Sequence, residues 1–189
     1  MSLFCECTAF LQGLFVMARR SWRLFKQPSI IHESAIIGAG TKIWAFSHVC
    51  ENAVIGENCV IGEGVHIGPG VVIGDNCKIQ NHALLYTGVT IGNRVFIGPN
   101  VVTTNDIDPQ ACGDWSERFR KTIIADDVAI GANSTILCGI TIERGCRIGC
   151  GSLITKDCKA WHRYYNPNTQ ALQMAEMTTP TNGTIRIEP

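Results

Sequence analysis

A period of six residues runs from Ile31 to Lys159 and restricts the fold more than any other feature of the chain. The first residue of each unit is nearly always Ile, and after one interruption the same phase resumes. The units begin at Ile31, Ile37, Ile43, Val49, Ile55, Ile61, Ile67, Ile73, Ile79, Leu85, Ile91, Ile97, Ile124, Ile130, Ile136, Ile142, Ile148 and Ile154. Four residues after each of them stands a small or branched side chain, and Gly often follows the lead residue directly.

This period matches neither an α-helix nor a two-faced β-strand. It fits a short strand and a turn with two inward side chains, so that three units close a triangular coil. Stacked coils bury a continuous core that no single repeat could bury alone. Eighteen units predict an all-β prism of about six coils with one long protruding loop and non-repetitive ends. At a strand spacing of about 4.8 Å, its height is roughly 30 Å.

Charge and cysteine content narrow the class of protein. Lys+Arg and Asp+Glu both number 16, and no basic stripe is present, so we expect no nucleic-acid partner. Cys59, Cys77, Cys146 and Cys158 occupy the small inward position of the repeat, where cysteine behaves as a buried apolar residue. We therefore expect reduced thiols and a cytoplasmic location.

The period divides the chain into three parts. Residues 1–28 are a leader, weakly ordered or a short helix; their apolar stretch is too short to span a bilayer, so we expect no integral membrane segment. Residues 29–159 form the repeat domain, with a loop at 108–123. Residues 160–189 form a cap and tail, in which Trp161 to Tyr165 cover the far end of the prism and disorder begins near Thr178.

Polar residues interrupt the repeat at three places, where we expect function to concentrate. One is Gln80-Asn81-His82 beside Tyr86, and the second is Thr104-Asn105-Asp106. The third is the loop, whose Arg118 has a guanidinium suited to phosphate, although a solvated loop that only packs is the alternative. Eighteen residues separate Tyr86 from Thr104, so these two should stack on adjacent coils.

The same spacing predicts two further stacks. His82 should lie between Gly64 and Asn100, and His48 should lie beside His66. The residues by themselves leave three kinds of chemistry open. A metal site could use His48, His66 and His82; acyl transfer could use His82 or Asn81 to orient or deprotonate a nucleophile; a structural or binding prism would use none of them.

Several motifs are more specific than the hexad. They are Lys78-Ile79-Gln80-Asn81-His82, Val89-Thr90-Ile91-Gly92, Phe96-Ile97-Gly98-Pro99-Asn100, Thr104-Asn105-Asp106 and Ile130-Gly131-Ala132-Asn133. With the hexads, they resemble the hexapeptide-repeat acyltransferases, most of all the N-acetyltransferases of nucleotide-linked 3-amino sugars. The resemblance covers about residues 30 to 159 and implies a left-handed parallel β-helix.

The resemblance also implies a function and a site. It implies transfer of acetyl from acetyl-CoA to a nucleotide-linked amino sugar for surface polysaccharides, by a homotrimer with active sites between subunits and with no metal. The catalytic candidates are Asn81 and His82, although many relatives have Asn in place of His82. The candidate residues for the sugar nucleotide are Tyr86, Thr104, Asn105, Asp106 and Arg118, and those for CoA are Gly131, Ala132, Gly149 and Lys156.

The mechanism that the resemblance implies is direct attack of a neutral sugar amine on the thioester, with a backbone N–H at a prism corner stabilising the oxyanion. An O-acetyltransferase acting on a sugar or serine hydroxyl is the main alternative. A γ-class carbonic anhydrase is a weaker one, because the Ile-Gly steps are never followed by His. The tail at Tyr164-Tyr165-Asn166-Pro167-Asn168 departs from the family pattern. The resemblance therefore does not define the part of the CoA site that would hold the adenine.

Overall fold

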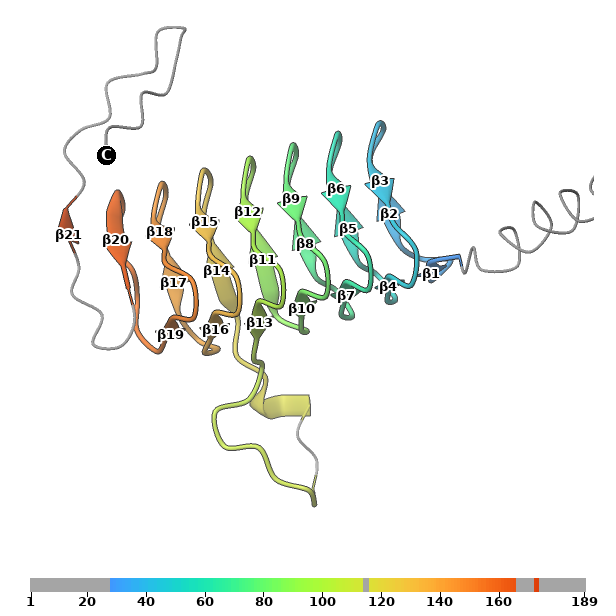
Figure 1. Ribbon diagram of the computed structural model, residues 1–189. Coiled ribbons are helices and arrows are strands. Elements are labelled where there is room, and N and C mark those ends of the chain that lie inside the picture. Colours follow the sequence, from blue (N-terminus) through green and yellow to red (C-terminus); the bar gives the residue numbers. More distant parts are fainter. Residues whose placement is uncertain (1–27, 114–115, 166–171, 174–189) are drawn as a thin grey trace, which may run out of the picture.

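The computed structural model describes residues 28–113, 116–165 and 172–173. These residues form a triangular prism whose sides are three β-sheets and whose long axis runs from β1 to β20 (Figure 1). The expectations for the leader, Pro28 excepted, and for the tail beyond Thr178 lie outside the described residues. Within the described residues, no helix has the length and apolar character that crossing a bilayer requires.

From β1 to β19 each sheet collects every third strand of the chain, and all pairs between successive turns are parallel. Sheet A consists of β1 (Ile30–Ile31), β4 (His48–Val49), β7 (His66–Ile67), β10 (Leu84–Leu85), β13 (Val102–Thr103), β16 (Thr135–Ile136) and β19 (Leu153–Ile154). Sheet B consists of β2 (Ile36–Ile37), β5 (Val54–Ile55), β8 (Val72–Ile73), β11 (Val89–Ile91), β14 (Thr122–Ile124) and β17 (Thr141–Ile142).

Sheet C consists of β3 (Lys42–Ile43), β6 (Val60–Ile61), β9 (Lys78–Ile79), β12 (Phe96–Ile97), β15 (Ala129–Ile130), β18 (Arg147–Ile148), β20 (His162–Tyr164) and β21 (Leu172–Gln173). The last pair, β20 with β21, is antiparallel. We name the turns between sheets as corners. Corner AB holds residues 32–35, 50–53, 68–71, 86–88, 104–121, 137–140 and 155–158. Corner BC holds 38–41, 56–59, 74–77, 92–95, 125–128 and 143–146. Corner CA holds 44–47, 62–65, 80–83, 98–101, 131–134 and 149–152.

The lead residues fill the interior. They are almost completely inaccessible from Ile55 to Ile142, and they pack with the small inward residues into one core. Successive turns are 18 residues apart, as in the pair Ile55 and Ile73. One excursion breaks this spacing, since Ile91 pairs with Ile124, 33 residues on. The last turn is shorter, and there Ile148 pairs with Tyr164, 16 residues on. The excursion leaves corner AB after β13, contains the 3₁₀ helix η1 (Ser116–Arg118), and projects below the prism in Figure 1.

The prediction of an all-β parallel β-helix is confirmed. The prism has about seven turns and not the expected six, since its three sheets contain seven, six and eight strands. Two strands account for the difference. β13 places Thr103 at a lead position, where its buried hydroxyl accepts a hydrogen bond from Tyr86 N at 2.9 Å. β20, in the predicted cap, adds a rung in which Tyr164 pairs with Ile148. Thr103 follows Ile97 by six residues, so the period allows a thirteenth unit there, whereas β20 carries no Ile and lies in the predicted cap.

Turn chemistry explains the Gly that follows many lead residues. A Cβ on Gly62 would collide with Asn81 Oδ1, and a Cβ on Gly74 would lie 2.6 Å from Asn93 Oδ1. In each case the Asn of the next turn reaches back and accepts a hydrogen bond from the N–H after the glycine. The glycine therefore makes room for a polar ladder that joins neighbouring turns.

Candidate functional site

The predicted site residues fall on two different corners. Asn81, His82, Gly131, Ala132 and Gly149 lie on corner CA. Tyr86, Thr104, Asn105, Asp106, Arg118 and Lys156 lie on corner AB or its excursion. A strand of sheet A lies between the two groups. The chain from His82 to Tyr86 advances four residues, which corresponds to about 13 Å when the chain is extended. Within one chain, the two groups are not brought together around a single small reacting group.

Asn81 belongs to the polar ladder of corner CA. Its Oδ1 accepts a hydrogen bond from the Glu63 N–H at 3.1 Å, although the side chain is exposed. Glu63 precedes the turn residue Gly64, so the carboxamide oxygen is engaged in joining two turns. The amide NH₂ group remains as the end of Asn81 that can donate to a substrate.

His82 has a backbone reason for its position. Its φ is 58°, in the left-handed region, and Asn fills the equivalent turn position at Asn100 (φ 56°) and Asn133 (φ 56°). The predicted stack is confirmed, because the His82 ring lies where a Cβ on Gly64 would have to be. This left-handed turn position favours Asn, so His82 replaces the residue type that fits the turn best. The ring is exposed and accessible to a ligand.

The base of the excursion is fixed by main-chain and side-chain hydrogen bonds. Thr104 Oγ1 accepts a hydrogen bond from Cys138 N at 2.9 Å, and the Asn105 carbonyl accepts one from Arg120 N at 2.9 Å. These contacts hold the outgoing chain to the returning chain and to the next turn. The predicted stack of Tyr86 with the following turn is confirmed through its N–H, which bonds to Thr103 Oγ1, the neighbour of Thr104.

An ion pair closes the base of the excursion. Arg118 Nη2 lies 2.7 Å from Asp106 Oδ2, and the same guanidinium donates to the Asp108 carbonyl. The hydrogen bond from Arg118 lowers the pKa of Asp106, and so do backbone donors such as the N–H of Asp108. Asp106 is therefore a carboxylate at neutral pH that positions Arg118, and it does not carry a transferable proton.

The glycines that the resemblance assigns to CoA lie where two turns stack closely. A Cβ on Gly131 would lie 2.6 Å from the Cys150 N, and a Cβ on Gly149 would lie 2.6 Å from the Tyr165 ring. Ala132 occupies the position in its turn of corner CA that Glu63 occupies in an earlier turn. The two residues differ in the partner of their backbone N–H. Glu63 N is capped by an Asn oxygen, whereas the turn above Ala132 offers Cys150, and within the described residues no side-chain cap of the Ala132 N–H is seen.

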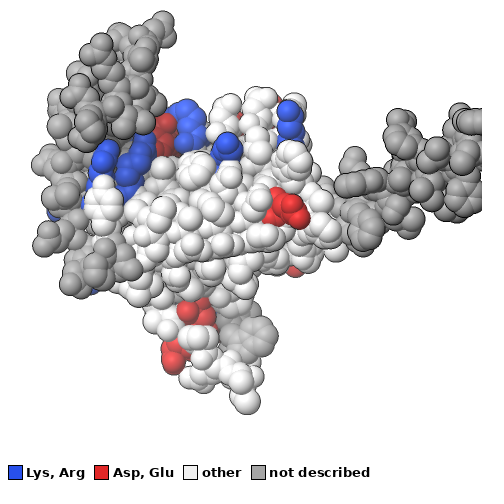
Figure 2. Space-filling model, in the orientation of Figure 1, with Lys and Arg blue, Asp and Glu red and all other residues white. Residues whose placement is uncertain are grey.

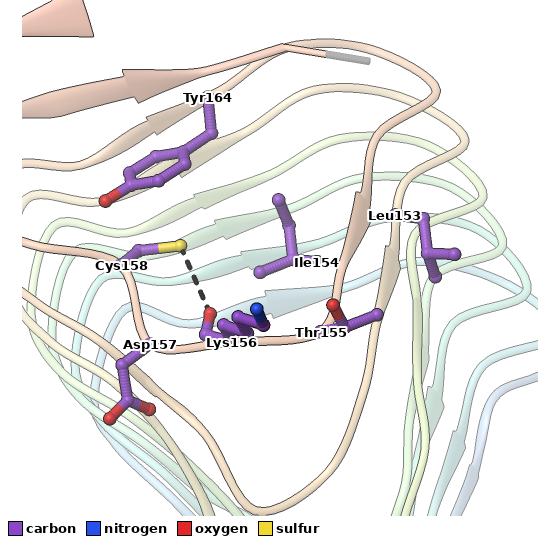
Figure 3. A pocket seen from close by; sticks show the side chains of 7 residues that line it. All are labelled: Leu153, Ile154, Thr155, Lys156, Asp157, Cys158 and Tyr164. Atoms are coloured by element: carbon purple, nitrogen blue, oxygen red, sulfur yellow. Dashed lines mark hydrogen bonds between the residues drawn. The ribbon is translucent and has the colours of Figure 1, made fainter. Parts of the chain in front are cut away.

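Lys156 lies at the far end of the prism, beside a cavity of about 370 Å³ (Figure 3). The cavity is lined by Leu153, Ile154, Thr155, Lys156, Asp157, Cys158 and Tyr164. Burial raises the pKa of the Cys158 thiol to about 12, so this cysteine stays protonated. The cavity lies at the far end of corner AB, several turns from Asn81 and beyond the excursion.

A basic cluster on corner BC was missed by the sequence reasoning. Arg94 Nε and Arg144 Nη2 lie 2.6 Å and 2.8 Å from the Asp127 carboxylate, and the Arg147 guanidinium donates to the Asp127 carbonyl. Figure 2 shows basic side chains gathered along the later turns at this edge, while the broad face beside them carries few charges. Register arithmetic could have found it, since Arg94 and Asp127 are 33 residues apart, as are Ile91 and Ile124.

A second polar cluster lies on sheet A and its AB corner. The predicted stack of His48 and His66 is confirmed, with ring centroids 5.5 Å apart, and His66 also contacts the Tyr86 ring at 5.6 Å. His82 is not part of this group. Its place beside the two histidines is taken by Cys50, which the sequence reasoning did not consider.

Comparisons with known proteins agree with this architecture. Crystal structures with similar folds include a point mutant of AntD, an N-acyltransferase from Bacillus cereus in complex with dTDP-4-amino-4,6-dideoxyglucose and coenzyme A. It is 19% identical, with a TM-score of 0.50 over 82% of this chain and 88% of that one. Another is the hexapeptide-repeat acetyltransferase VCA0836 from Vibrio cholerae, 20% identical, with a TM-score of 0.51 over 72% of both chains.

Among curated proteins, the bifunctional protein GlmU of Paraburkholderia phytofirmans is 32% identical over 158 residues, which are 76% of this chain and 33% of that protein. GlmU of Dechloromonas aromatica is 39% identical over 146 residues, 69% of this chain and 30% of that protein. The chain thus spans about a third of the length of these relatives. The family described as "Bacterial transferase hexapeptide (six repeats)" matches residues 34–69, 52–87, 70–105 and 121–156, more than half of the chain. The protein therefore belongs to the bacterial hexapeptide transferase family.

Proposed function

We propose that this protein is an acetyl-CoA-dependent N-acetyltransferase that acts on a nucleotide-linked amino sugar. The observation that carries the proposal is the fixed polar excursion at corner AB, which leaves the prism one turn after the polar turn of corner CA. A plain prism has flat faces, and this excursion adds a wall whose base is held by the Arg118–Asp106 pair and by the Asn105 carbonyl. The family membership and the folds of the solved N-acyltransferases support the same chemistry.

The separation of the two corners supports a site shared between copies of the chain. A strand of sheet A keeps Asn81 and Arg118 on different corners of one prism. In a closed trimer, corner CA of one copy can face corner AB of the next. Such an arrangement would unite the two groups, and the proposal therefore includes a homotrimer.

The proposed roles follow from the hydrogen-bonding capacity of each group. The Asn81 amide orients the sugar amine, and Arg118, held by Asp106, contacts phosphate of the nucleotide. The amine attacks the thioester carbonyl, a C–N bond forms and the C–S bond breaks. The Ala132 N–H donates to the oxyanion, which contributes about 3 kcal/mol in a well-aligned site. Coenzyme A leaves as a thiolate and takes up the proton that the amine loses.

The role of His82 separates two versions of this mechanism. Because a neutral amine is already a fair nucleophile, positioning supplies most of the gain, and Asn81→Ala lowers turnover more than His82→Ala. A general base at His82 would instead contribute about 10²–10⁴-fold. Steady-state kinetics on both variants decide between them, since the reverse order identifies His82 as the base.

The experiment is a thiol-release assay with acetyl-CoA and a panel of UDP- and dTDP-linked 3-amino and 4-amino sugars. Serine and simple galactosides serve as hydroxyl acceptors. Turnover on one amino sugar supports the proposal and names the substrate. Turnover on the hydroxyl acceptors alone assigns the protein to the O-acetyltransferases. Trimeric protein that binds CoA but acylates nothing contradicts the acceptor class, and protein that does not bind CoA contradicts acyl transfer itself.

A further inference from the structure

Three side chains with metal-binding atoms meet on two neighbouring turns. His48 and Cys50 come from β4 and the corner that follows it, and His66 comes from β7 in the next turn. One ligand atom of each lies within 4.8 Å of the other two. The Cys50 Sγ is 3.9 Å from His48 Nε2.

The β-helix itself creates this arrangement. Alternation along β4 points His48 and Cys50 to the same outer side, while Val49 between them points into the core. The 18-residue register then places His66 directly beside His48. By the same register, the residue next to Cys50 in the following turn is Gly68, which puts no side chain against the thiol. Backbone pairing thus fixes the positions of all three groups.

The donor set has a clear chemical preference. Two imidazoles and one thiolate suit Zn²⁺ and similar borderline-soft ions, and they suit Mg²⁺ or Ca²⁺ poorly. Ligands at normal distances from a tetrahedral zinc ion are about 3.4–3.6 Å apart. The Cys50–His48 pair needs a few tenths of an ångström to reach that spacing, and a pair at the 4.8 Å limit needs about 1.3 Å, which side-chain rotation can supply.

The three donor atoms are within reach of an ion from solvent. His48 is exposed and His66 is partly exposed, whereas Cys50 beneath them is 7% exposed. Because cysteine binds a metal as the thiolate, binding displaces the thiol proton of Cys50 and releases it to solvent.

We propose that His48, Cys50 and His66 form a binding site for a Zn²⁺-type ion that links two turns of the prism, with a water molecule as fourth ligand. The site lies two turns before the excursion and shares no residue with the proposed acyl-transfer machinery. It does not depend on the proposed function, and it departs from the expectation, drawn from the family resemblance, that no metal binds.

The test uses the full chain, stripped with a chelator and titrated with Co²⁺ followed by Zn²⁺. Co²⁺ reports a thiolate ligand through a ligand-to-metal charge-transfer band and a four-coordinate site through intense d–d absorption. We expect one ion per chain, a thiolate band, and loss of both signals when Zn²⁺ displaces Co²⁺. Absence of a thiolate band in the native chain overturns the proposal.

Variants locate the ion among ten cysteines and five histidines. Cys50→Ser should abolish the charge-transfer band, and His66→Asn should weaken binding at least about tenfold, since loss of an outer-shell partner alone costs that much. Cys112→Ser, on the exposed excursion, is the matched thiol control. His82→Asn is the matched imidazole control. The sequence also has two cysteines one residue apart, Cys5 and Cys7, and the double variant Cys5→Ser with Cys7→Ser tests this CxC pair.

Each outcome is decisive. Loss of the band in Cys50→Ser together with its persistence in the controls supports the site. A band that survives Cys50→Ser, or that disappears with the CxC pair, assigns the ion elsewhere and overturns the proposal. Thermal unfolding of each variant without metal shows whether the fold is intact. If Cys50→Ser does not fold, Cys50→Ala and His66→Asn give the same decision.

Discussion

Replacing Gly98 by Ala tests the idea that close stacking of turns, and not chain flexibility, requires glycine at corner CA. A Cβ at Gly98 would lie 2.6 Å from Ala132 N, 2.8 Å from Gly131 C and 2.8 Å from Ile130 O. All three atoms belong to the backbone of the next turn, so no flexible side chain can move aside. Overpacking of this kind costs about 1–3 kcal/mol. For a domain of this size, we expect a melting temperature lower by about 2–12 °C.

Gly70 offers a matched control. Its φ is 66°, nothing would lie within 4 Å of a Cβ there, and Asn fills the same left-handed position at Asn52 and Asn100. Gly70→Asn should therefore change stability by less than about 0.5 kcal/mol. The assay is thermal unfolding followed by circular dichroism, with a second probe to test for two-state behaviour. Equal melting temperatures for Gly98→Ala and the unchanged chain would refute the stacking argument, and so would an equal loss in Gly70→Asn.

Three further outcomes follow from the electrostatics and the turns. Asp106→Asn should raise KM for a nucleotide-sugar acceptor more than it lowers kcat, because it releases Arg118; an unchanged KM in steady-state assays would contradict this role. The Arg94 hydrogen bond lowers the pKa of Asp127, so its contribution is present above the unfolded pKa near 4 and is lost as pH falls through the lower folded pKa. Asp127→Asn should therefore flatten the acid side of the stability–pH curve, and a curve of unchanged steepness in acid titrations would exclude that cause. His82→Asn should melt at the same temperature or slightly higher, because Asn tolerates the left-handed turn better; a clearly lower melting temperature would show that the ring stabilises the turn.

The metal proposal and the acyl-transfer proposal can fail separately. The three ligands lie on sheet A and its corner near the beginning of the prism, whereas the excursion leaves after β13. Loss of metal should therefore change thermal stability without abolishing acetyl transfer. If chelation abolished transfer at unchanged stability, the ion would belong to the reaction and not to the fold.

The six-residue period of the sequence predicts much of the architecture. An 18-residue register follows from three six-residue units, and this register alone places His48 beside His66 and His82 over Gly64. The core follows as well, since a lead Ile in each unit must be buried in a solenoid. Such predictions succeed because contacts between neighbouring turns depend on a constant spacing along the chain.

Other features required the tertiary structure. Tyr164 adds a rung on Ile148, which a pattern based on Ile does not predict. Thr103 keeps the six-residue phase, but only the structure shows that its buried hydroxyl accepts a hydrogen bond from Tyr86 N. The pair of Arg118 with Asp106 and the cluster around Asp127 depend on where an irregular excursion returns, which changes the spacing from 18 to 33 residues.

The division of the candidate site was also decided by the structure. The sequence indicated which polar residues interrupt the repeat, but not that Asn81 and Arg118 lie on different corners of one prism. It also did not reveal that Cys50, and not His82, completes the group around the two histidines. A period defines the distance between turns, whereas the direction of a side chain at a corner depends on the local backbone angles and on the neighbour above it. The sequence by itself determined the coil and its core, and only the tertiary structure decided which polar groups meet.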